Sequence, residues 1–258
     1  MNYINTTTDT RGVTTLTLNR PDTYNALNRV FIDELTDSVN ELDKNTRVLV
    51  LAATGKHFCA GADIHWMKAS EKLSDLQNRK DAMAFSNMLE AVNSFERPTI
   101  ARIQGAALGG GTGLACCCDI VVASDSARFA FSEVKLGIIP ATISPYSLGA
   151  IGSRAARRYF LTGETIEASE AYRIGLIHDL CTSESLDEHL EAHISRLLSA
   201  SSQAQAAAKK LIYDVTGQPA NATLRENLAN RLASIRAGAD AQEGLGAFLE
   251  KRAPNWKF

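Results

Sequence analysis

Three consecutive glycines, Gly109 to Gly111, interrupt an apolar stretch that runs from Ile103 to Ser124. Glycine gives up more backbone freedom on folding than any other residue, so a run of three indicates that the backbone comes very close to something else. The flanking apolar residues predict a strand, a tight turn and the start of a buried helix. If that helix begins at Gly110, its amide N–H has no partner within the helix and suits a developing negative oxygen.

A phosphate group is the usual ligand of a glycine-rich turn, but the spacing here does not fit one. No Gly-Lys-Ser/Thr follows the glycines, and G-x-G-x-x-G cannot be read through Gly109 to Gly113. The other interpretation is a helix packed so closely that side chains do not fit. This stretch alone slightly favours close packing, and a second matching element is needed to favour an oxyanion site.

Strands and helices alternate around the glycines, which predicts an α/β architecture. The expected strands are Val13–Leu18, Val48–Ala53 and Thr99–Ile103, and the expected helices cover residues 26–42 and 71–95. A short extended segment is expected over residues 129–146, and almost everything from residue 184 onward reads as helix. We place a core at residues 1–198 and a helical extension at 199–258, where Lys209 and Lys210 read as a solvated helix face.

Composition argues against several classes of partner. A net charge of −2 over 258 residues gives no electrostatic reason to expect nucleic acid or an anionic membrane. No apolar run approaches the roughly 20 residues of a membrane span, and the N-terminus lacks a signal-peptide pattern, so we expect a cytoplasmic protein. The cysteines imply neither a disulfide framework nor a metal site and read as small buried apolar residues: Cys59, Cys116, Cys117, Cys118 and Cys181.

A second motif, TGKHFCAGADI at residues 54–64, changes how the glycines are interpreted. Together with GAALGGGTGLACCCDI at residues 105–120, it resembles the enoyl-CoA hydratase/isomerase family, also called the crotonase superfamily. The likeness also covers NRPDTYNALN, SEVKLGIIP and FLEKRAPNW, and so nearly the whole chain. It implies a spiral of ββα turns and a C-terminal helical region that builds trimers, often paired into hexamers.

The resemblance also implies the substrate, an acyl-CoA thioester. In the family the thioester oxygen lies between two backbone N–H groups, one from each motif, and these correspond to Ala62 and Gly110. Proton transfer beside a thioester passes through an enolate-like oxyanion, which fixed donors stabilise more than the starting carbonyl. Coenzyme A is part of the substrate, so no separate cofactor is expected. The residues that the resemblance places along it are Ala26, Lys56, Ala60, Asp63, Ile64, Phe248 and Lys251.

The catalytic carboxylates depart from the family pattern. Family hydratases use two glutamates that flank the double bond; the second corresponds to Glu133, while the first falls on Gly113, which has no side chain. Burial in an apolar acyl pocket would raise the pKa of Glu133 toward neutrality, which suits proton exchange at the α-carbon. We therefore assign Glu133 as the general acid/base.

One carboxylate leaves two reactions open. Moving a proton between two carbons, the isomerase reaction, needs nothing more. Adding water to the β-carbon also needs a group that holds the water, which Gly113 cannot supply. A hydratase would need a substitute, such as Thr112, Ser144, Tyr146 or a carboxylate on the substrate. A third reading is a non-catalytic acyl-CoA-binding protein, which the retained Glu133 argues against.

The segment SEVKLGIIPATISPY favours hydration of a dicarboxylic substrate. With glycine in place of the first glutamate, it resembles a bacterial subgroup associated with 3-methylglutaconyl-CoA and isohexenylglutaconyl-CoA hydration in leucine and acyclic terpene breakdown. We expect the second carboxylate of such a substrate to be held by Arg154, Arg157 or Arg158, or by Ser144 and Tyr146, and to help organise the water.

Overall fold

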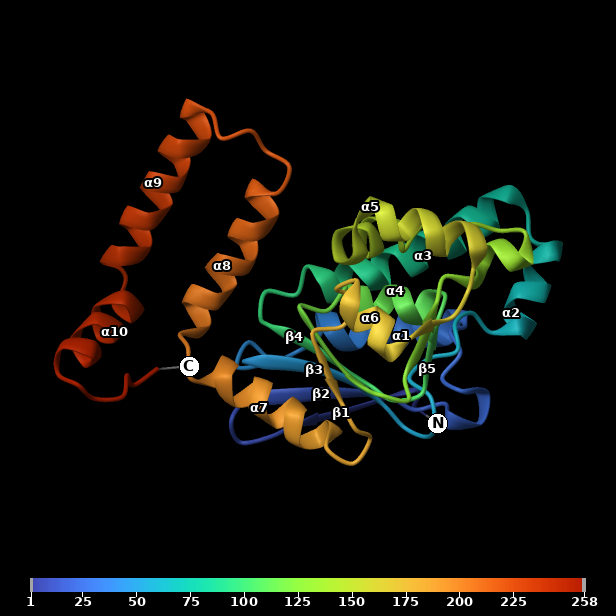
Figure 1. The fold of residues 1–258 in the computed structure, drawn as a ribbon, viewed down its shortest axis with the longest axis horizontal. Coiled ribbons are helices and arrows are strands. Elements are labelled where there is room, and N and C mark those ends of the chain that lie inside the picture. The colour runs from blue at the N-terminus through green and yellow to red at the C-terminus, as the bar shows by residue number, and fades with distance from the viewer. Residues whose placement is uncertain (1, 257–258) are drawn as a thin grey trace.

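The computed structural model describes residues 2–256, whose strands and helices form the layers drawn in Figure 1. The larger sheet in this range has six strands in the order β1-β2-β3-β4-β6-β9. β1 pairs antiparallel with β2, and the other neighbours in this sheet are parallel. The strands are β1 (Ile4–Thr8), β2 (Val13–Leu18), β3 (Val48–Ala53), β4 (Thr99–Ile103), β6 (Ile120–Ser124) and β9 (Asp179–Cys181). The three strands expected from the sequence are confirmed, and β1 was not foreseen.

The central strand β3 is buried on both faces because helices cover both sides of the sheet. Side chains alternate along a strand. Leu49 and Leu51 therefore join the cluster that includes α1 (Arg29–Asn40) and α3 (Asp75–Asn93), while Val48 and Val50 pack with α7 (Leu186–Leu198). Figure 1 shows α1 and α3 on one side of the sheet and α7 on the other.

A smaller sheet of three strands, in the order β5-β7-β8, positions the glycine turn. Its strands are β5 (Ala106–Leu108), β7 (Arg128–Ala130) and β8 (Ile166–Glu167). β5 and β7 are parallel neighbours, so the residues that follow them emerge at the same edge. Helix α4 (Gly110–Cys116) begins just after β5, and the 3₁₀ helix η3 (Ser132–Leu136) begins just after β7. This pairing brings the glycines and Glu133 together.

The expected extended segment at residues 129–146 is largely wrong. Extended backbone ends at Ala130, η3 follows, and α5 (Ser144–Thr162) has already begun by residue 144. Gly137 stops η3 with a left-handed φ of 74°, and Pro145 occupies the first turn of α5, where a missing N–H costs nothing. The prolines and the glycine thus mark a turn and a helix start instead of a strand.

Two of the expected helices are confirmed with shorter bounds. α1 begins at Arg29 because the Asn28 side chain accepts a hydrogen bond from the Phe31 amide, at 2.9 Å. α3 begins at Asp75 after a capping box between Ser74 and Gln77. The shorter helices beside them are α2 (Ile64–Ala69), η1 (Pro21–Thr23), η2 (Ser70–Lys72) and α6 (Ala168–Arg173).

The C-terminal helices stand away from the sheets (Figure 1). They are α8 (Ser202–Val215), α9 (Ala222–Ala237) and α10 (Ala239–Leu249). No residue of α8 or α9 is buried. Within residues 2–256, no helix combines the length and apolar character that a bilayer crossing requires. The predicted division at residues 198/199 falls between α7 and α8 and stays a prediction.

One ion pair ties α8 to the core. Lys209 lies 2.8 Å from Asp119, which also accepts hydrogen bonds from the amide and hydroxyl of Thr99 on β4. The expectation that Lys209 is a solvated surface residue is therefore wrong, because its side chain is only 15% exposed. Lys210, whose side chain is 71% exposed, pairs with Asp214 one turn along the helix.

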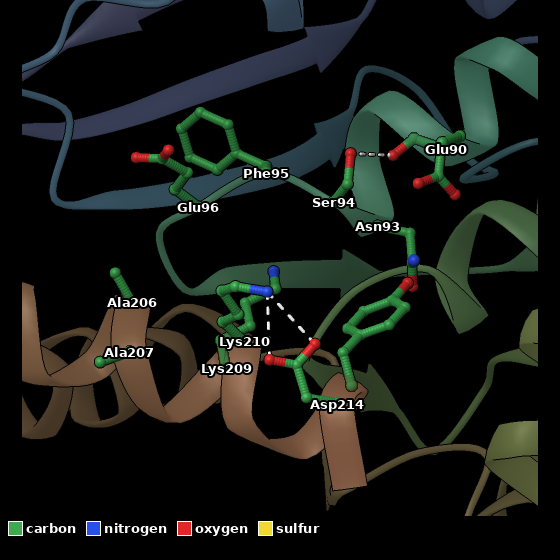
Figure 2. A pocket seen from close by; sticks show the side chains of 11 residues that line it. Glu90, Asn93, Ser94, Phe95, Glu96, Ala206, Ala207, Lys209, Lys210 and Asp214 are labelled. Atoms are coloured by element: carbon green, nitrogen blue, oxygen red, sulfur yellow. Dashed lines mark hydrogen bonds and ion pairs between the residues drawn. The ribbon is translucent and has the colours of Figure 1, made fainter. Parts of the chain in front are cut away.

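A cavity of about 480 Å³ separates the end of α3 from α8. Figure 2 shows the side chains that line it, including Glu90, Asn93, Lys210 and Asp214. Lys210 is paired with Asp214, and Glu90 accepts a hydrogen bond from Tyr146. The side-chain amide nitrogen of Asn93 is buried without a partner among the described residues. None of the residues predicted to bind or convert acyl-CoA lines this cavity.

Candidate active site

Gly109 connects β5 to α4 in a conformation that other residues rarely adopt. Its φ is 50°, and its amide donates to the carbonyl of Ala130 on β7, at 2.8 Å. A Cβ at this position would lie 3.1 Å from Oε1 of Glu133. Glycine is thus required both by the turn and by the carboxyl group that packs against it.

Gly110 is the first residue of α4, and its amide donates to no other residue in the described part of the chain. A Cβ here would approach Leu27 to 2.8 Å and Phe85 to 2.9 Å, closer than real Cβ contacts. Close packing and a free donor, the two interpretations of the glycine run, are therefore both present at this residue.

The Thr54–Ile64 motif supplies a second free amide. The amide of Leu27 donates to the carbonyl of Gly61, and the amide of Asp63 donates to the carbonyl of Leu27, each at 2.8 Å. Ala62 lies between these two bonds, and its own amide donates to no residue within 2–256. Ala62 is also exposed, so a ligand has access to it.

Hydrogen bonds hold the two motifs side by side. The amide of Cys59 donates to Ala106 at 3.0 Å, and the amide of Leu108 donates back to Cys59 at 2.9 Å. A Cβ on Gly61, the residue before Ala62, would lie 2.9 Å from the carbonyl oxygen of Leu108. The two unpaired amides therefore belong to neighbouring backbone segments, and that arrangement suits a shared oxyanion.

Glu133, the predicted acid/base, lies against the glycine turn. It lies on η3, with Oε1 against Gly109 and Oε2 buried without a hydrogen-bond partner among the described residues. Burial raises its pKa, partly offset by a backbone hydrogen bond that favours the charged form. A carboxyl group with one unsatisfied oxygen, beside the turn that carries the free amide of Gly110, can exchange protons with a ligand bound there.

Gly113 lies in α4 four residues after Gly109, and the side chain of Ile143 covers it. A Cβ on Gly113 would lie 2.1 Å from Cγ2 of Ile143. The neighbouring Thr112 is fully buried, and its hydroxyl lies 2.6 Å from the carbonyl of Ala107 and 3.0 Å from that of Ala130. Those backbone acceptors already engage the hydroxyl hydrogen of Thr112, one of the groups proposed to hold water.

The other two proposed water-holding hydroxyls are also engaged. Ser144 donates to the carbonyl of Ala141 at 2.8 Å, and the Tyr146 hydroxyl bonds to Glu90 at 3.1 Å. Burial and the contact with Glu90 raise the pKa of the Tyr146 phenol. The first bond closes the turn before α5 and the second joins α5 to α3, and the role of both hydroxyls with substrate stays a prediction.

The predicted coenzyme A residues of the Thr54–Ile64 motif flank Ala62. Lys56 is exposed, Ile64 is 79% exposed, and Ala60 is half-buried. Ala26 is buried, so only a backbone or edge contact with the ligand is open to it. These positions leave the surface beside Ala62 open, as a long pantetheine chain would require.

Asp63 has a structural use that the sequence did not reveal. Its carboxylate lies 3.1 Å from Arg20 and accepts hydrogen bonds from the amides of His65 and Trp66 at the start of α2. Burial disfavours the charge, but the bonds from Arg20 and from these amides hold its pKa below the ordinary value. Asp63 thus shapes the loop that presents Ala62.

Phe248 and Lys251 lie far from these residues in the same chain. Phe248 is at the end of α10 and is 80% exposed, and Lys251 follows it. Figure 1 shows α10 and α2 at opposite ends of the molecule. The structure therefore does not bring the end of α10 to α2 within one chain, and the contact of Phe248 and Lys251 with coenzyme A stays a prediction.

The three candidate arginines are not brought to Glu133. Arg154, Arg157 and Arg158 line a separate cavity of about 490 Å³ between α5 and α6, together with Arg173. Arg158 is paired with Glu164 at 2.8 Å. Neither Glu133 nor Gly113 lines that cavity, so the structure does not support these arginines as the group that holds a substrate carboxylate.

Asn25 is an organising residue that sequence reasoning missed. It is fully buried with a positive φ of 55°, accepts a hydrogen bond from the Arg20 amide and donates to the carbonyls of Thr54 and His57. His57 in turn accepts from the amide of Ala106 at 3.0 Å. Asparagine tolerates this backbone region and its amide bonds several groups at once, which was the available signal within NRPDTYNALN.

Comparisons with known proteins agree with this geometry. The family model described as enoyl-CoA hydratase/isomerase matches residues 8–258. A crystal structure of an enoyl-CoA hydratase from Shewanella pealeana superposes with a TM-score of 0.94 and 40% identity, covering 98% of this chain and 96% of that one. The 2,3-dehydroadipyl-CoA hydratase of Escherichia coli is 33% identical over 94% of both chains. The crotonyl-CoA hydratase of Syntrophomonas wolfei is 34% identical over 93% of both.

Proposed function

The chain belongs to the enoyl-CoA hydratase/isomerase family, and we propose that it is a lyase that adds water across the 2,3 double bond of an enoyl-CoA thioester. One observation carries the proposal: the unpaired amides of Ala62 and Gly110 lie on joined segments beside the buried carboxyl group of Glu133. That arrangement provides an oxyanion site and a proton carrier in one place.

The reaction follows from these groups. The thioester oxygen accepts hydrogen bonds from both amides, each such donor contributing about 3 kcal/mol to the stability of the transition state. The ionised Glu133 takes a proton from water as the water oxygen bonds to the β-carbon, and the π electrons move onto the thioester oxygen as an enolate. Glu133 then returns the proton to the α-carbon. The net change is the addition of H and OH.

We further propose that the acyl group is dicarboxylic and branched, as in 3-methylglutaconyl-CoA. Two points support this: the chain lacks a second carboxylate at Gly113, and the Escherichia coli relative is named for a dicarboxylic acyl group, dehydroadipyl. A carboxylate on the substrate would supply the missing polar group.

A second candidate is the isomerase reaction, favoured by the single carboxylate. Glu133 would then remove a proton from the α-carbon of a 3-enoyl-CoA and return it to the γ-carbon, leaving the 2,3 double bond. No water is needed, which agrees with the apolar cover that Ile143 places over Gly113.

A panel of thioesters separates these reactions. Crotonyl-CoA, 3-methylglutaconyl-CoA and a 3-enoyl-CoA are supplied, and products are resolved by mass and chromatography. Hydration of 3-methylglutaconyl-CoA at ten times the rate of crotonyl-CoA or more supports the proposal. Equal or faster turnover of crotonyl-CoA removes the dicarboxylic proposal, and double-bond migration without hydration replaces the hydratase with the isomerase.

We also propose that the active form is a trimer or a pair of trimers. The exposed apolar side chains of α9 and α10 support assembly, as does the distance of Phe248 and Lys251 from the rest of the predicted coenzyme A site. Light scattering of the purified protein tests this, and a monomer that is fully active would contradict it.

A further inference from the structure

The side chain of Ile143 fills the space into which a side chain at residue 113 would extend. A Cβ built on Gly113 would lie 2.1 Å from Cγ2, 2.6 Å from Cβ and 3.5 Å from Cδ1 of Ile143. Ile143 is only 1% exposed and belongs to the main hydrophobic core. Protein interiors are packed like organic crystals, so a side chain at residue 113 has nowhere to go while Ile143 is present.

This contact lies next to the proton carrier. Gly109, whose Cα faces Glu133, and Gly113 are one helical turn apart in α4, with the amide of Gly113 donating to the carbonyl of Gly109 at 3.0 Å. Four residues of helix span about 6 Å. Glu133 and Ile143 therefore cover successive turns of the same short helix.

We propose that Ile143 is a specificity-determining residue that limits this site to one carboxylate. The inference rests on the proposed function and on the position of the first family glutamate at residue 113. Ile143 takes the space into which that glutamate would extend and replaces a polar group with an apolar wall. The site then favours acyl groups that bring their own polar group for the water, and disfavours a plain enoyl chain such as crotonyl.

The distances specify which substitutions would replace the pair Gly113 and Ile143 by a glutamate at residue 113 and a small residue at 143. Gly113→Glu alone collides with Ile143. Ile143→Ala removes Cγ2 but leaves its Cβ at 2.6 Å, still too close. Ile143→Gly removes all three atoms, and glycine is accepted at residue 143 because this is the N-cap of α5. The two residues must therefore change together, with Ile143→Gly opening the space that Gly113→Glu fills.

The test compares Gly113→Glu/Ile143→Gly with Gly113→Gln/Ile143→Gly. The glutamine variant has the same shape and cannot act as a base. We expect the glutamate variant to hydrate crotonyl-CoA at least 10-fold faster than the glutamine variant, because a positioned general base contributes about 10²-fold or more. Equal rates in two folded proteins that bind crotonyl-CoA overturn the proposal.

A stability measurement keeps the proposal testable if both double variants fold poorly. Gly113→Ala should lower the urea midpoint of unfolding. The double variant Gly113→Ala/Ile143→Gly should lose less stability than the sum of the losses of the two single variants, because Ile143→Gly makes room for the added Cβ. Additive effects would show that the two residues do not share the space and would overturn the proposal. The outcome is independent of the reaction catalysed by the wild type, which the thioester panel tests separately.

Discussion

The core helix α1 and the C-terminal helix α9 differ in what covers their apolar side chains. α1 buries Phe31, Ile32, Leu35 and Val39 against the sheet, whereas no residue of α9 is buried. Leu232 is 58% exposed and Phe248 80% exposed. Spacing predicts that a helix has an apolar face, and burial depends on the partner that the fold supplies. In the core the partner is in the same chain; for the C-terminal helices we propose a second copy.

This contrast predicts that core changes alter the chemistry and leave assembly intact. Glu133→Gln should lower kcat about 10²- to 10⁴-fold, the usual contribution of a general acid/base, with acyl-CoA affinity within a few-fold of wild type. Steady-state rates and calorimetric binding measure the two quantities. Glu188→Gln on α7, an exposed glutamate, is the control. Full activity of Glu133→Gln would remove the assigned role.

A change in the C-terminal helices should do the opposite and alter assembly. Leu232→Asp places a charge at an exposed apolar position of α9, so we expect the assembled form to dissociate at micromolar concentration in light scattering. Asn230→Asp adds the same charge at an exposed polar position of the same helix and should leave the assembly unchanged. An intact assembly in Leu232→Asp would mean that this face of α9 does not form the interface.

A smaller effect is expected from packing inside the core. A Cβ on Gly111 would lie 2.4 Å from the carbonyl oxygen of Cys59, so Gly111→Ala should destabilise by about 1–3 kcal/mol through overpacking. Gly149 in α5 has nothing within 4 Å of a built Cβ, and Gly149→Ala should be neutral or stabilising by up to about 1 kcal/mol. Urea unfolding distinguishes them, and equal midpoints would contradict the packing assignment.

The buried carboxyl group should also make core stability depend on pH. Because burial raises the pKa of Glu133 in the folded state, the folded protein binds more protons than the unfolded one above the ordinary glutamate pKa. Its contribution to stability is thus present in acid and lost as pH rises through the raised pKa. As pH rises through the raised pKa of Glu133, the free energy of unfolding of Glu133→Gln should increase relative to that of the wild type. The difference between Gly149→Ala and the wild type should stay constant over the same pH range.

The sequence predicted the parts of the fold that local spacing specifies. The strands β2, β3 and β4 and the helices α1 and α3 follow from periodicity, and the structure shows that Asn28 caps the start of α1. The smaller sheet was missed because β5, β7 and β8 have only two or three residues each, too few for a pattern. Their pairing depends on contacts between distant segments, which the residues themselves do not display.

The candidate site also has a part that the sequence predicts and a part that only the fold reveals. The motifs predicted Ala62, Gly110 and Glu133 as site residues, because backbone amides and one carboxylate need only the correct turn. The side chains around them depend on neighbours brought in by the fold: Ile143 covers Gly113, and Asn25 joins two loops. Gly113 was visible in the sequence as a departure from the expected pattern, but Ile143, the residue that fills the space beside it, was not.

The smallest expected effect tests the contact between the two regions. Lys209→Gln breaks a partly buried pair with Asp119, so we expect a loss of about 1 kcal/mol, whereas Lys210→Gln breaks an exposed pair one helical turn apart, worth about 0.3–0.5 kcal/mol. Unfolding midpoints of the neighbouring variants provide the comparison. If the two losses are equal, the Lys209 pair does not hold α8 on the core, and the remaining contacts, such as the bond from Arg97 to the carbonyl of Ser202, set its position.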